Sequence, residues 1–340
     1  MKVLTLGEMM LRLKPVGNNR IMQSDVLEAT YGGAEANVAV SLALLGDEVA
    51  YLTKLPANLL GETALSTLRK YGVDTTKVLR GGNRLGIYFL EKGASVRSTN
   101  VVYDRAGSAF AEVTQAEFDW DAIFSDIDYF YFSGITPAIS AELERIVTAA
   151  CEYCQAHDIP VICDMNYRGK MWSPEKAQRV MSTLMPYVAI CIANDEDFAA
   201  TLGIDAFDGD MSRGIDQKES FKEGMLAVTQ KYPDCKIVAS VLRNIHSVED
   251  SQWMGLLLKD GAFYESTAYK MHVMEGVAAG DAFGAGLMHS LLHNFAAQEW
   301  IDFAIAASVL KLTVSGDLNL VHESEIRAVM KKGGGASLNR

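Results

Sequence analysis

The sequence predicts an α/β fold with a mostly parallel central sheet, helices on both of its faces and a small β-sheet lid. From about residue 120 onward, apolar runs of strand length alternate with segments of helical periodicity. Because these runs are apolar throughout, they indicate strands buried on both faces, as in a parallel sheet between two helical layers. In the N-terminal third, short segments alternate between polar and apolar residues, which is typical of a separate, half-exposed sheet.

The individual elements follow from the same patterns. The segment from Ala34 to Leu45 is mostly apolar and is followed by Gly46, so it predicts a largely buried helix. Helical periodicity also spans residues 140–157. Half-exposed strands are expected within residues 12–22, at 86–91 and at 99–103, and buried strands at 129–134, 160–164, 188–194 and 236–241.

Two excursions of the chain are expected to form the lid. The polar, glycine-containing segment 205–222 predicts a surface loop, and the tail from Gly333 onward is expected to fray. The expected division is residues 1–10, 31–84 and 112–340 for the large α/β domain, and residues 11–30 and 85–111 for the lid.

The composition limits the classes of function. With 31 Lys and Arg against 43 Asp and Glu, the net charge of −12 argues against nonspecific binding of nucleic acid or of an anionic membrane surface. No stretch approaches the roughly 20 apolar residues of a membrane span, and the N-terminus lacks a signal-peptide pattern, so a cytoplasmic protein is expected. Cys151 and Cys154 form a CxxC within a helical pattern, which indicates packing rather than a metal or redox site.

The segment from Met271 to Gly286 carries the strongest chemical signal. An apolar run predicts a strand, small residues predict a tight turn, and a helix is expected to begin at about Gly280. A helix start made of small residues leaves free backbone N–H groups and a positive dipole end, which together form an anion site. Asp281 would repel a phosphate there, unless its carboxylate takes a proton from an attacking hydroxyl. This pattern favours a kinase acting on an alcohol; ordinary helix capping by Asp281 is the alternative.

Polar residues also follow the neighbouring strands. Asp164, Asn194 and Arg243 each come at the end of an expected strand, and Asp281 follows the next one. Ligands of open parallel sheets bind beyond the carboxyl ends of the strands, so these residues predict one functional cleft. Arg168 has two possible roles. It forms an ion pair with Asp164, or it donates two hydrogen bonds to a ligand carboxylate or to a pair of sugar hydroxyls.

Three further groups have two readings each. The acidic residues after Asn194, which include Asp197, cap a helix or suit Mg²⁺ bound through water. The paired glycines before Asn37 permit close approach of a ligand, whose hydroxyls Asn37 can bind, or they form a tight turn. The third group consists of Tyr88, Tyr103 and Arg105. They are ordinary exposed strand residues, or they contribute to the cleft if the small sheet closes over it.

Two motifs together carry a family resemblance. The segments 32–39 (GGAEANVA) and 279–286 (AGDAFGAG) resemble the paired signatures of the ribokinase family of carbohydrate kinases, and the likeness extends over nearly the whole chain. Within this family the chain is most similar to the branch of 2-keto-3-deoxygluconate kinases, through residues 7–8, 103–109 and 164–172. The stretch 242–253 is similar to one branch of those enzymes.

The resemblance implies a ribokinase-like fold and ATP-dependent, Mg²⁺-assisted phosphorylation of a primary hydroxyl of a sugar acid. It also implies a homo-oligomer that associates through its lids. Asp281 would be the general base, and the backbone amides of Ala278, Ala279, Gly280 and Asp281 would form the anion hole. The sugar acid would be held by Gly32, Gly33, Asn37, Tyr88, Tyr103, Arg105, Asn166 and Arg168, the nucleotide by Asn194, Arg243 and Gly280, and Mg²⁺ by Asp197 through water.

The chain departs from the family pattern at several positions. The family usually has glycine where Ala278 stands, and alanine costs on the order of 1 kcal/mol if the backbone there needs a positive φ. Asp197 stands where glutamate is preferred, and the loop expected after Leu242 lacks the usual glycines. Ala278 leaves open a catalytically weak, sugar-binding relative.

A kinase of a neutral sugar such as fructose or ribose is the other alternative. Arg105 and Arg168 argue against it, because a neutral sugar needs no partner for a carboxylate. A dinucleotide-dependent dehydrogenase does not fit, because no G-x-G-x-x-G follows the first strand.

Overall fold

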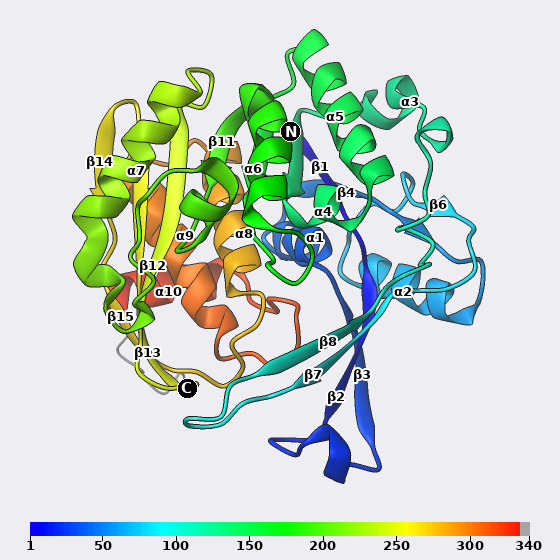
Figure 1. The fold of residues 1–340 in the computed structure, drawn as a ribbon, viewed down its shortest axis with the longest axis horizontal. Coiled ribbons are helices and arrows are strands. Elements are labelled where there is room, and N and C mark those ends of the chain that lie inside the picture. Colours follow the sequence, from blue (N-terminus) through cyan, green and yellow to red (C-terminus); the bar gives the residue numbers. More distant parts are fainter. Residues whose placement is uncertain (334–340) are drawn as a thin grey trace.

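The main body is built on one sheet of nine strands. In the computed structural model, which describes residues 1–333, it lies between two layers of helices (Figure 1). In spatial order its strands are β14 (Ala262–Glu265), β13 (Asp250–Lys259), β12 (Ile237–Ile245), β11 (Val188–Ile192), β10 (Val161–Asp164), β9 (Tyr129–Ser133), β1 (Lys2–Leu6) and β4 (Glu48–Leu52), and β15 (Tyr269–His272) pairs with β13.

The sheet is mostly parallel, as predicted. Strands from β4 through β12 pair in parallel, whereas β13 is antiparallel to β12, β14 and β15. The expected loop after Leu242 is wrong, because β12 continues to Ile245 and turns back into β13. The sequence obscured this hairpin because polar residues, among them Arg243, interrupt the apolar run inside the strand.

Helices cover both faces of the sheet, which confirms the predicted layers. One face packs against α3 (Trp120–Phe124), α5 (Ala141–Ala156), α6 (Pro174–Leu184) and α7 (Lys218–Lys231), and α4 (Ile135–Ile139) follows β9. The other face packs against α1 (Ala34–Leu44), α2 (Leu59–Lys70), α8 (Ala279–Leu292) and α9 (Ala297–Lys311), with α10 (Glu323–Lys332) outside α9.

Two of these helices follow their sequence patterns closely. Helix α5 begins after Ser140, whose Oγ accepts a hydrogen bond from the amide of Leu143 at 3.1 Å. Both Cys151 and Cys154 are buried on its inner side, and burial raises the pKa of the Cys154 thiol to about 12, which agrees with a packing role. Helix α1 is almost entirely buried, and Gly46 after it has a φ of +93°.

A second sheet of four strands projects from the body at the bottom of Figure 1. Its spatial order is β3 (Leu27–Gly32), β2 (Met10–Pro15), β7 (Ile87–Glu91) and β8 (Asn100–Asp104). Strand β3 was not expected, and the strand expected within 12–22 ends at Pro15 instead. The reason is that β3 is mostly exposed and therefore has no apolar pattern. A short ladder joins β5 (Lys54–Leu55) and β6 (Leu79–Arg80).

Some expectations for the chain's periphery are corrected or lie outside the described part. Segment 205–222 is a loop only in part, because α7 begins at Lys218 and Phe221 within it is fully buried. The expected fraying concerns residues 334–340, which the structure does not describe. Within residues 1–333, none of the helices combines the length and apolarity needed to cross a bilayer.

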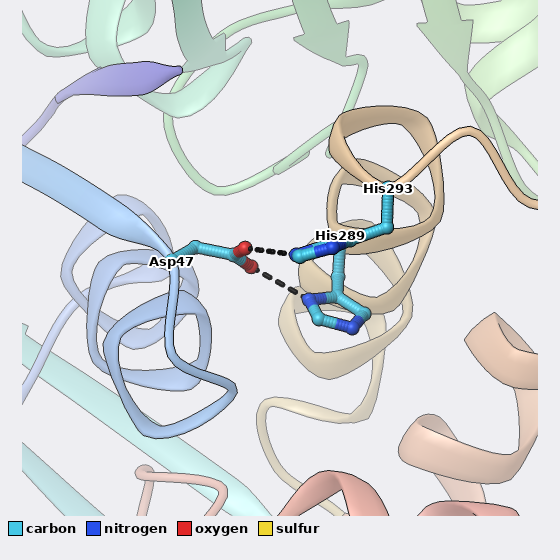
Figure 2. Close-up of side chains that lie close together, drawn as sticks. All are labelled: Asp47, His289 and His293. Atoms are coloured by element: carbon cyan, nitrogen blue, oxygen red, sulfur yellow. Dashed lines mark hydrogen bonds and ion pairs between the residues drawn. The ribbon is translucent and has the colours of Figure 1, made fainter.

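Helices α1 and α8 pack side by side and position the centre of the molecule. Their N-terminal ends bring Asn37 and Asp281 together, with Asn37 Nδ2 donating to Asp281 Oδ2 at 2.7 Å. Near their C-terminal ends, Asp47, which follows α1, contacts His289 of α8 and His293, the residue directly after α8 (Figure 2). The two helices are thus joined by polar contacts at both ends.

Candidate active site

A cavity of about 660 Å³ lies between the main sheet and the small sheet, a volume within the usual range of small-molecule sites. The polar residues that follow the strands of the main sheet meet in it. Of the residues singled out from the sequence, those that line it are Gly33, Asn37, Tyr88, Tyr103, Arg105, Asp164, Asn166, Arg168, Asn194, Asp197, Arg243, Ala278, Ala279, Gly280 and Asp281.

Gly32 is the one predicted site residue that the cavity lining does not include. A side chain on Gly32 would lie 2.6 Å from Cβ of Asp317, and one on Gly33 would lie 2.0 Å from the carbonyl oxygen of Glu8. The paired glycines therefore permit close approach of protein to protein. Gly33 also has an extended backbone, with φ of 176°, so these glycines do not form the tight turn considered above.

The N-terminus of α8 opens into the cavity. The helix begins at Ala279, within one residue of the prediction, and Ala278 before it is left-handed with φ of +59°. Among the described residues, the backbone amides of 278–281 have no hydrogen-bond acceptor. Four unpaired N–H groups at a helix start form a site for an anion. Alanine at a left-handed position stores on the order of 1 kcal/mol of strain, as the departure from glycine implied.

Asp281 lies in the first turn of this helix with its carboxylate buried. Burial raises the pKa of its carboxyl to about 6, although the hydrogen bond from Asn37 and the charge of Arg168 act in the opposite direction. A carboxyl with such a pKa is ionised at neutral pH and is a stronger base than an exposed aspartate. The geometry suits proton abstraction from a hydroxyl held beside the free amides.

The three arginines of the cavity differ in their partners. Nε of Arg105 donates to Glu8 Oε2 at 2.7 Å, and Arg243 forms an ion pair with Asp195. Arg168 is exposed and forms no ion pair with any residue of the described chain. The structural bridge between Arg168 and Asp164 considered above is therefore not formed. Arg168 presents an uncompensated positive charge to the cavity.

Two buried carboxylates face the other side of the cavity. Asp197 accepts hydrogen bonds from the backbone amides of Tyr167 at 2.7 Å and Asn194 at 2.8 Å, so both of its oxygens are engaged. Asp164 is 2% exposed, and its Oδ1 has no hydrogen-bond partner among the described residues. Burial, together with the negative charges of Asp197 and Asp281, raises the pKa of Asp164 well above its usual value.

The side chain of Asn194 is also engaged, since its Oδ1 accepts from the amide of Val241 at 2.7 Å. Tyr88, Tyr103 and Arg105 of the small sheet do line the cavity, with the Arg105 guanidinium 5.6 Å from the Tyr103 ring centre. The small sheet thus contributes side chains to the same site as the main sheet.

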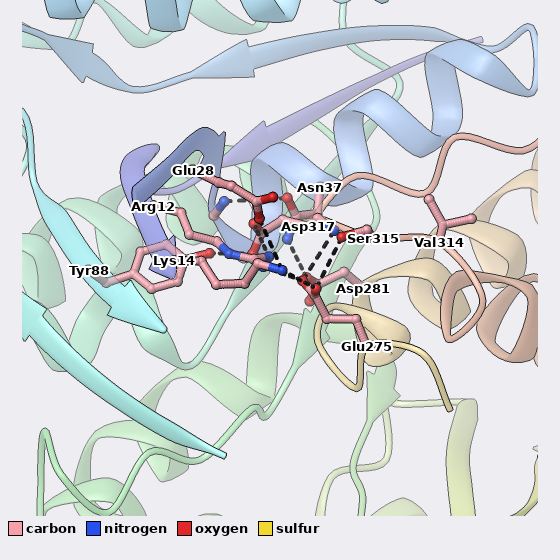
Figure 3. A network of polar contacts seen from close by, with 12 residues as sticks. Arg12, Lys14, Glu28, Asn37, Tyr88, Glu275, Asp281, Val314, Ser315 and Asp317 are labelled. Carbon is pink, nitrogen blue, oxygen red and sulfur yellow. Dashed lines mark hydrogen bonds and ion pairs between the residues drawn. The ribbon is translucent and has the colours of Figure 1, made fainter. Parts of the chain in front are cut away.

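A buried ionic network beside the cavity was missed by the sequence analysis (Figure 3). Arg12 pairs with Glu275 and, at 2.9 Å, with Asp317, while Lys14 lies 3.3 Å from Glu275. Asp317 also accepts a hydrogen bond from the hydroxyl of Tyr88. Apart from Tyr88, which was predicted as a site residue, only Glu275 had a signal in the sequence, because it directly precedes the small-residue turn; no pattern connects Arg12 with Asp317.

Open parallel sheets bind ligands at the edge where this cavity lies, and a free helix N-terminus beside a buried carboxylate is suited to moving a phosphoryl group onto a hydroxyl. The fold and the site together define a small-molecule kinase. Comparison with known families makes the assignment definite: residues 1–323 match the pfkB family carbohydrate kinases, so the chain belongs to that family and is a carbohydrate kinase with the expected ribokinase-like fold.

Individual relatives are similar over their full lengths. A 2-dehydro-3-deoxygalactonokinase from Haloferax volcanii is 31% identical over 339 residues, which cover 100% of this chain and 99% of that protein. The crystal structure of 2-dehydro-3-deoxygluconokinase from Thermotoga maritima has 43% identity and a TM-score of 0.93, covering 97% of this chain and 99% of its own. A PfkB family carbohydrate kinase from Listeria grayi has 32% identity and a TM-score of 0.90, covering 98% and 100%.

Proposed function

We propose that this protein is an ATP-dependent sugar-acid kinase that phosphorylates the primary hydroxyl of 2-keto-3-deoxygluconate or a close relative. The observation that carries the proposal is the pairing of a buried carboxylate, Asp281, with four free amides at the start of α8. The relatives named as kinases of 2-dehydro-3-deoxygluconate and of its galactonate counterpart support the same class of substrate.

In this reaction the carboxylate of Asp281 takes the proton of the sugar hydroxyl. The hydroxyl oxygen forms a bond to the γ-phosphorus of ATP while the bond from that phosphorus to the bridging oxygen breaks, and ADP leaves with the bridging oxygen. The amides of 278–281 donate to the phosphoryl oxygens, whose charge they stabilise. Asn37 holds the Asp281 carboxylate in place through the 2.7 Å hydrogen bond.

Mg²⁺ fits the acidic side of the cavity through its water shell. The free Oδ1 of Asp164 is the best acceptor for a metal-bound water, because both oxygens of Asp197 already accept backbone amides. When bound there, the ion neutralises charge on the phosphates of the nucleotide. Asp197 then contributes its negative charge and holds the backbone of Tyr167 and Asn194 in place, but it does not bind the metal's water shell directly.

Arg168 is proposed to bind the carboxylate of the sugar acid. Its guanidinium has no ion-pair partner among the described residues, whereas Glu8 neutralises Arg105 and Asp195 neutralises Arg243. A guanidinium binds a carboxylate through two parallel hydrogen bonds, which gives orientation as well as affinity. Gly33, Asn37, Tyr88, Tyr103 and Asn166 then surround the rest of the sugar acid.

The small sheet is proposed to act as a lid over this site and as the surface through which two copies associate. Its ranges are 11–30 and 85–111, as the sequence predicts. Exposed apolar side chains on it support association, because removing apolar surface from water favours a complex; they include Val16, Met22, Val26, Val96 and Val102. The cytoplasmic location stays a prediction.

Two alternatives differ from this proposal at specific residues. A neutral-sugar kinase would leave Arg168 without a partner. A catalytically weak, sugar-binding relative would owe its low activity to Ala278, whose methyl group lies at the left-handed position beside the free amides. Both alternatives are distinguishable by turnover and binding measured with the same panel of sugars.

The test is ADP formation by the purified protein with ATP and Mg²⁺, using 2-keto-3-deoxygluconate, its galactonate counterpart, fructose, ribose and no sugar. Turnover restricted to the sugar acids is expected, and Asp281→Asn should lower it by about 10²–10⁴-fold while sugar binding persists. Preference for fructose or ribose would replace the sugar-acid assignment. Sugar-acid binding without turnover by the unaltered protein would favour the weak relative.

A further inference from the structure

A second polar cluster lies outside the cavity, between the C-terminal ends of α1 and α8 (Figure 2). The carboxylate of Asp47 forms hydrogen bonds with Nδ1 of His289 at 2.8 Å and with Nε2 of His293 at 2.9 Å. The donor atoms of the three side chains all lie within 4.8 Å of one another, and within residues 1–333 no other group of histidines, cysteines and acidic residues is arranged in this way. The cluster plays no part in the kinase chemistry described above.

The burial of these side chains is unusual for a simple surface ion pair. The side chains of His289 and Asp47 are 1% and 3% exposed, whereas that of His293 is 50% exposed. The ring of His289 stacks on Phe303, with 5.1 Å between centres. With Nδ1 of His289 donating to Asp47, its buried Nε2 has no hydrogen-bond partner in the described chain, and the nearest carboxylate oxygen, that of Glu323, is 4.0 Å away.

We propose that Asp47, His289 and His293 form a binding site for one divalent transition-metal ion such as Zn²⁺, Co²⁺ or Ni²⁺. Two histidines four residues apart lie on the same face of α8, and imidazole nitrogens with one carboxylate are a donor set that these ions favour. Small side-chain rotations bring the donors to bond lengths of about 2.0–2.2 Å. The hard ion Mg²⁺ of the kinase reaction prefers oxygen donors and is not the expected occupant.

Metal binding also accounts for the orphaned nitrogen of His289. When Nδ1 binds the metal, the proton of the neutral imidazole moves to Nε2, which faces the carboxylate of Glu323. A ligating histidine commonly directs its other N–H at a carboxylate in this way. The same change at His293 moves its proton to Nδ1, and because that ring is half-exposed, water can accept it. The exposed side of His293 leaves room for water to complete the coordination.

The position of the site indicates a stabilising role. Asp281 and His289 are eight residues apart on α8, about 12 Å along the helix axis. A metal here would fasten the segment after α1 to α8, the two helices whose N-termini hold Asn37 and Asp281. Because the bound ion favours the folded state, it should raise the melting temperature without taking part in phosphoryl transfer.

The test is metal binding by the full-length protein prepared without a polyhistidine tag and dialysed against a chelator. Titration calorimetry with ZnCl₂, and the visible absorption of Co²⁺, are expected to show one ion per chain with a Kd below about 10 μM. Zn²⁺ should also raise Tm. The variant His293→Ala, which changes an exposed side chain, is expected to weaken binding at least about tenfold and to lose the Tm increase.

Matched variants separate this site from other acidic groups. His272→Ala removes an exposed histidine that faces a single aspartate, Asp250, at 3.1 Å, and should leave metal binding unchanged. Asp47→Asn retains the shape of the cluster and should weaken binding as His293→Ala does. No binding at about 100 μM Zn²⁺, or binding that survives both His293→Ala and Asp47→Asn, overturns the proposal; in the second case the ion would lie in the acidic cavity.

Discussion

Two groups of buried carboxylates lie in and beside the same cavity and differ in their partners. Glu275 and Asp317 are paired with Arg12 and Lys14 in the network of Figure 3. Asp164 and Asp281 have no cation within ion-pair distance among the described residues. Burial acts to raise the pKa in both groups, but Arg12 and Lys14 outweigh it at Glu275, whose pKa is lowered, whereas the pKa values of Asp164 and Asp281 are raised.

The difference indicates a division of work. The paired group connects β2 and β7 of the small sheet to the segments on either side of α8 and α9, so it fixes the small sheet over the cavity. The unpaired group destabilises the unliganded protein, because buried carboxylates without an ion-paired cation are unfavourable, and such groups are typical of functional sites. Ligands that supply a proton, metal-bound water or a hydroxyl to these two carboxylates would reduce this destabilisation.

The largest expected effect comes from breaking the paired group with Arg12→Met. This change keeps most of the apolar volume but leaves Glu275 and Asp317 buried without their main cation, which should lower the free energy of unfolding by about 3–5 kcal/mol. Urea denaturation followed by circular dichroism measures it. The matched control is Arg20→Met, which removes an exposed partner of Glu91 and should change stability by less than about 1 kcal/mol. Equal effects of the two variants would show that the network does not hold the fold.

The second effect concerns Arg168, the cavity arginine that has no ion-pair partner among the described residues. Arg168→Ala should raise KM for the sugar acid by about 10²-fold, because hydrogen bonds to a charged group are worth about 1.5–3 kcal/mol. Binding of a neutral sugar should change much less. Lys170→Ala, a nearby change whose ammonium donates to the carbonyl of Val101 at 3.0 Å and does not line the cavity, is the control. Equal losses for acidic and neutral sugars would make Arg168 structural.

The third effect is the pH dependence of catalysis. A general base works only when deprotonated, so with a pKa of about 6 for Asp281, kcat/KM should reach half of its maximum near that pH and fall about tenfold per pH unit below it. The hydrogen bond from Asn37 lowers this pKa; Asn37→Ala should therefore shift the acid limb to higher pH. Profiles of both proteins measured with the sugar acid check this. If the acid limb of the kcat/KM profile is the same in Asn37→Ala as in the unaltered protein, Asn37 does not influence the pKa of the general base.

The sequence predicted the main sheet, its helices and most residues of the cavity, because burial leaves a periodic apolar pattern and because the strand ends of a parallel sheet share one edge. It missed β3, whose side chains are mostly exposed. It also missed the pair of Arg12 and Asp317, which are 305 residues apart, since no local pattern encodes such a contact.

The pKa values of the site residues could not be predicted from the sequence either. The chemical role expected for Asp281 followed from its place at a helix start, but its raised pKa depends on its burial in the folded protein. Strain at Ala278 was predicted only for the case that its backbone has a positive φ. The structure shows a φ of +59° at this residue. Sequence patterns therefore gave the positions of the groups, while the folded arrangement determined their charges.

The smallest expected effect comes from removing one charge of the unpaired group with Asp164→Asn. The amide retains an acceptor for Asn166 Nδ2, which donates to Asp164 at 3.3 Å. Its NH₂ group replaces Oδ1, which accepts no hydrogen bond from the described residues, so no existing bond is lost. Removing the buried charge should outweigh the new N–H without an acceptor and raise the free energy of unfolding by about 1 kcal/mol at neutral pH. Because the pKa of Asp164 is raised in the folded state, ionisation destabilises the fold as pH rises. The gain should therefore disappear in acid, where the carboxyl is protonated both folded and unfolded.

Asp197→Asn is the matched variant and should have the opposite sign. Both oxygens of Asp197 accept backbone amides, so replacing one oxygen with an NH₂ group leaves a buried N–H without an acceptor. Thermal denaturation of both variants at neutral and acidic pH distinguishes the two cases. If Asp164→Asn destabilises the protein as Asp197→Asn does, then Asp164 has a structural partner, and its carboxylate does not belong to the group that ligands are expected to relieve.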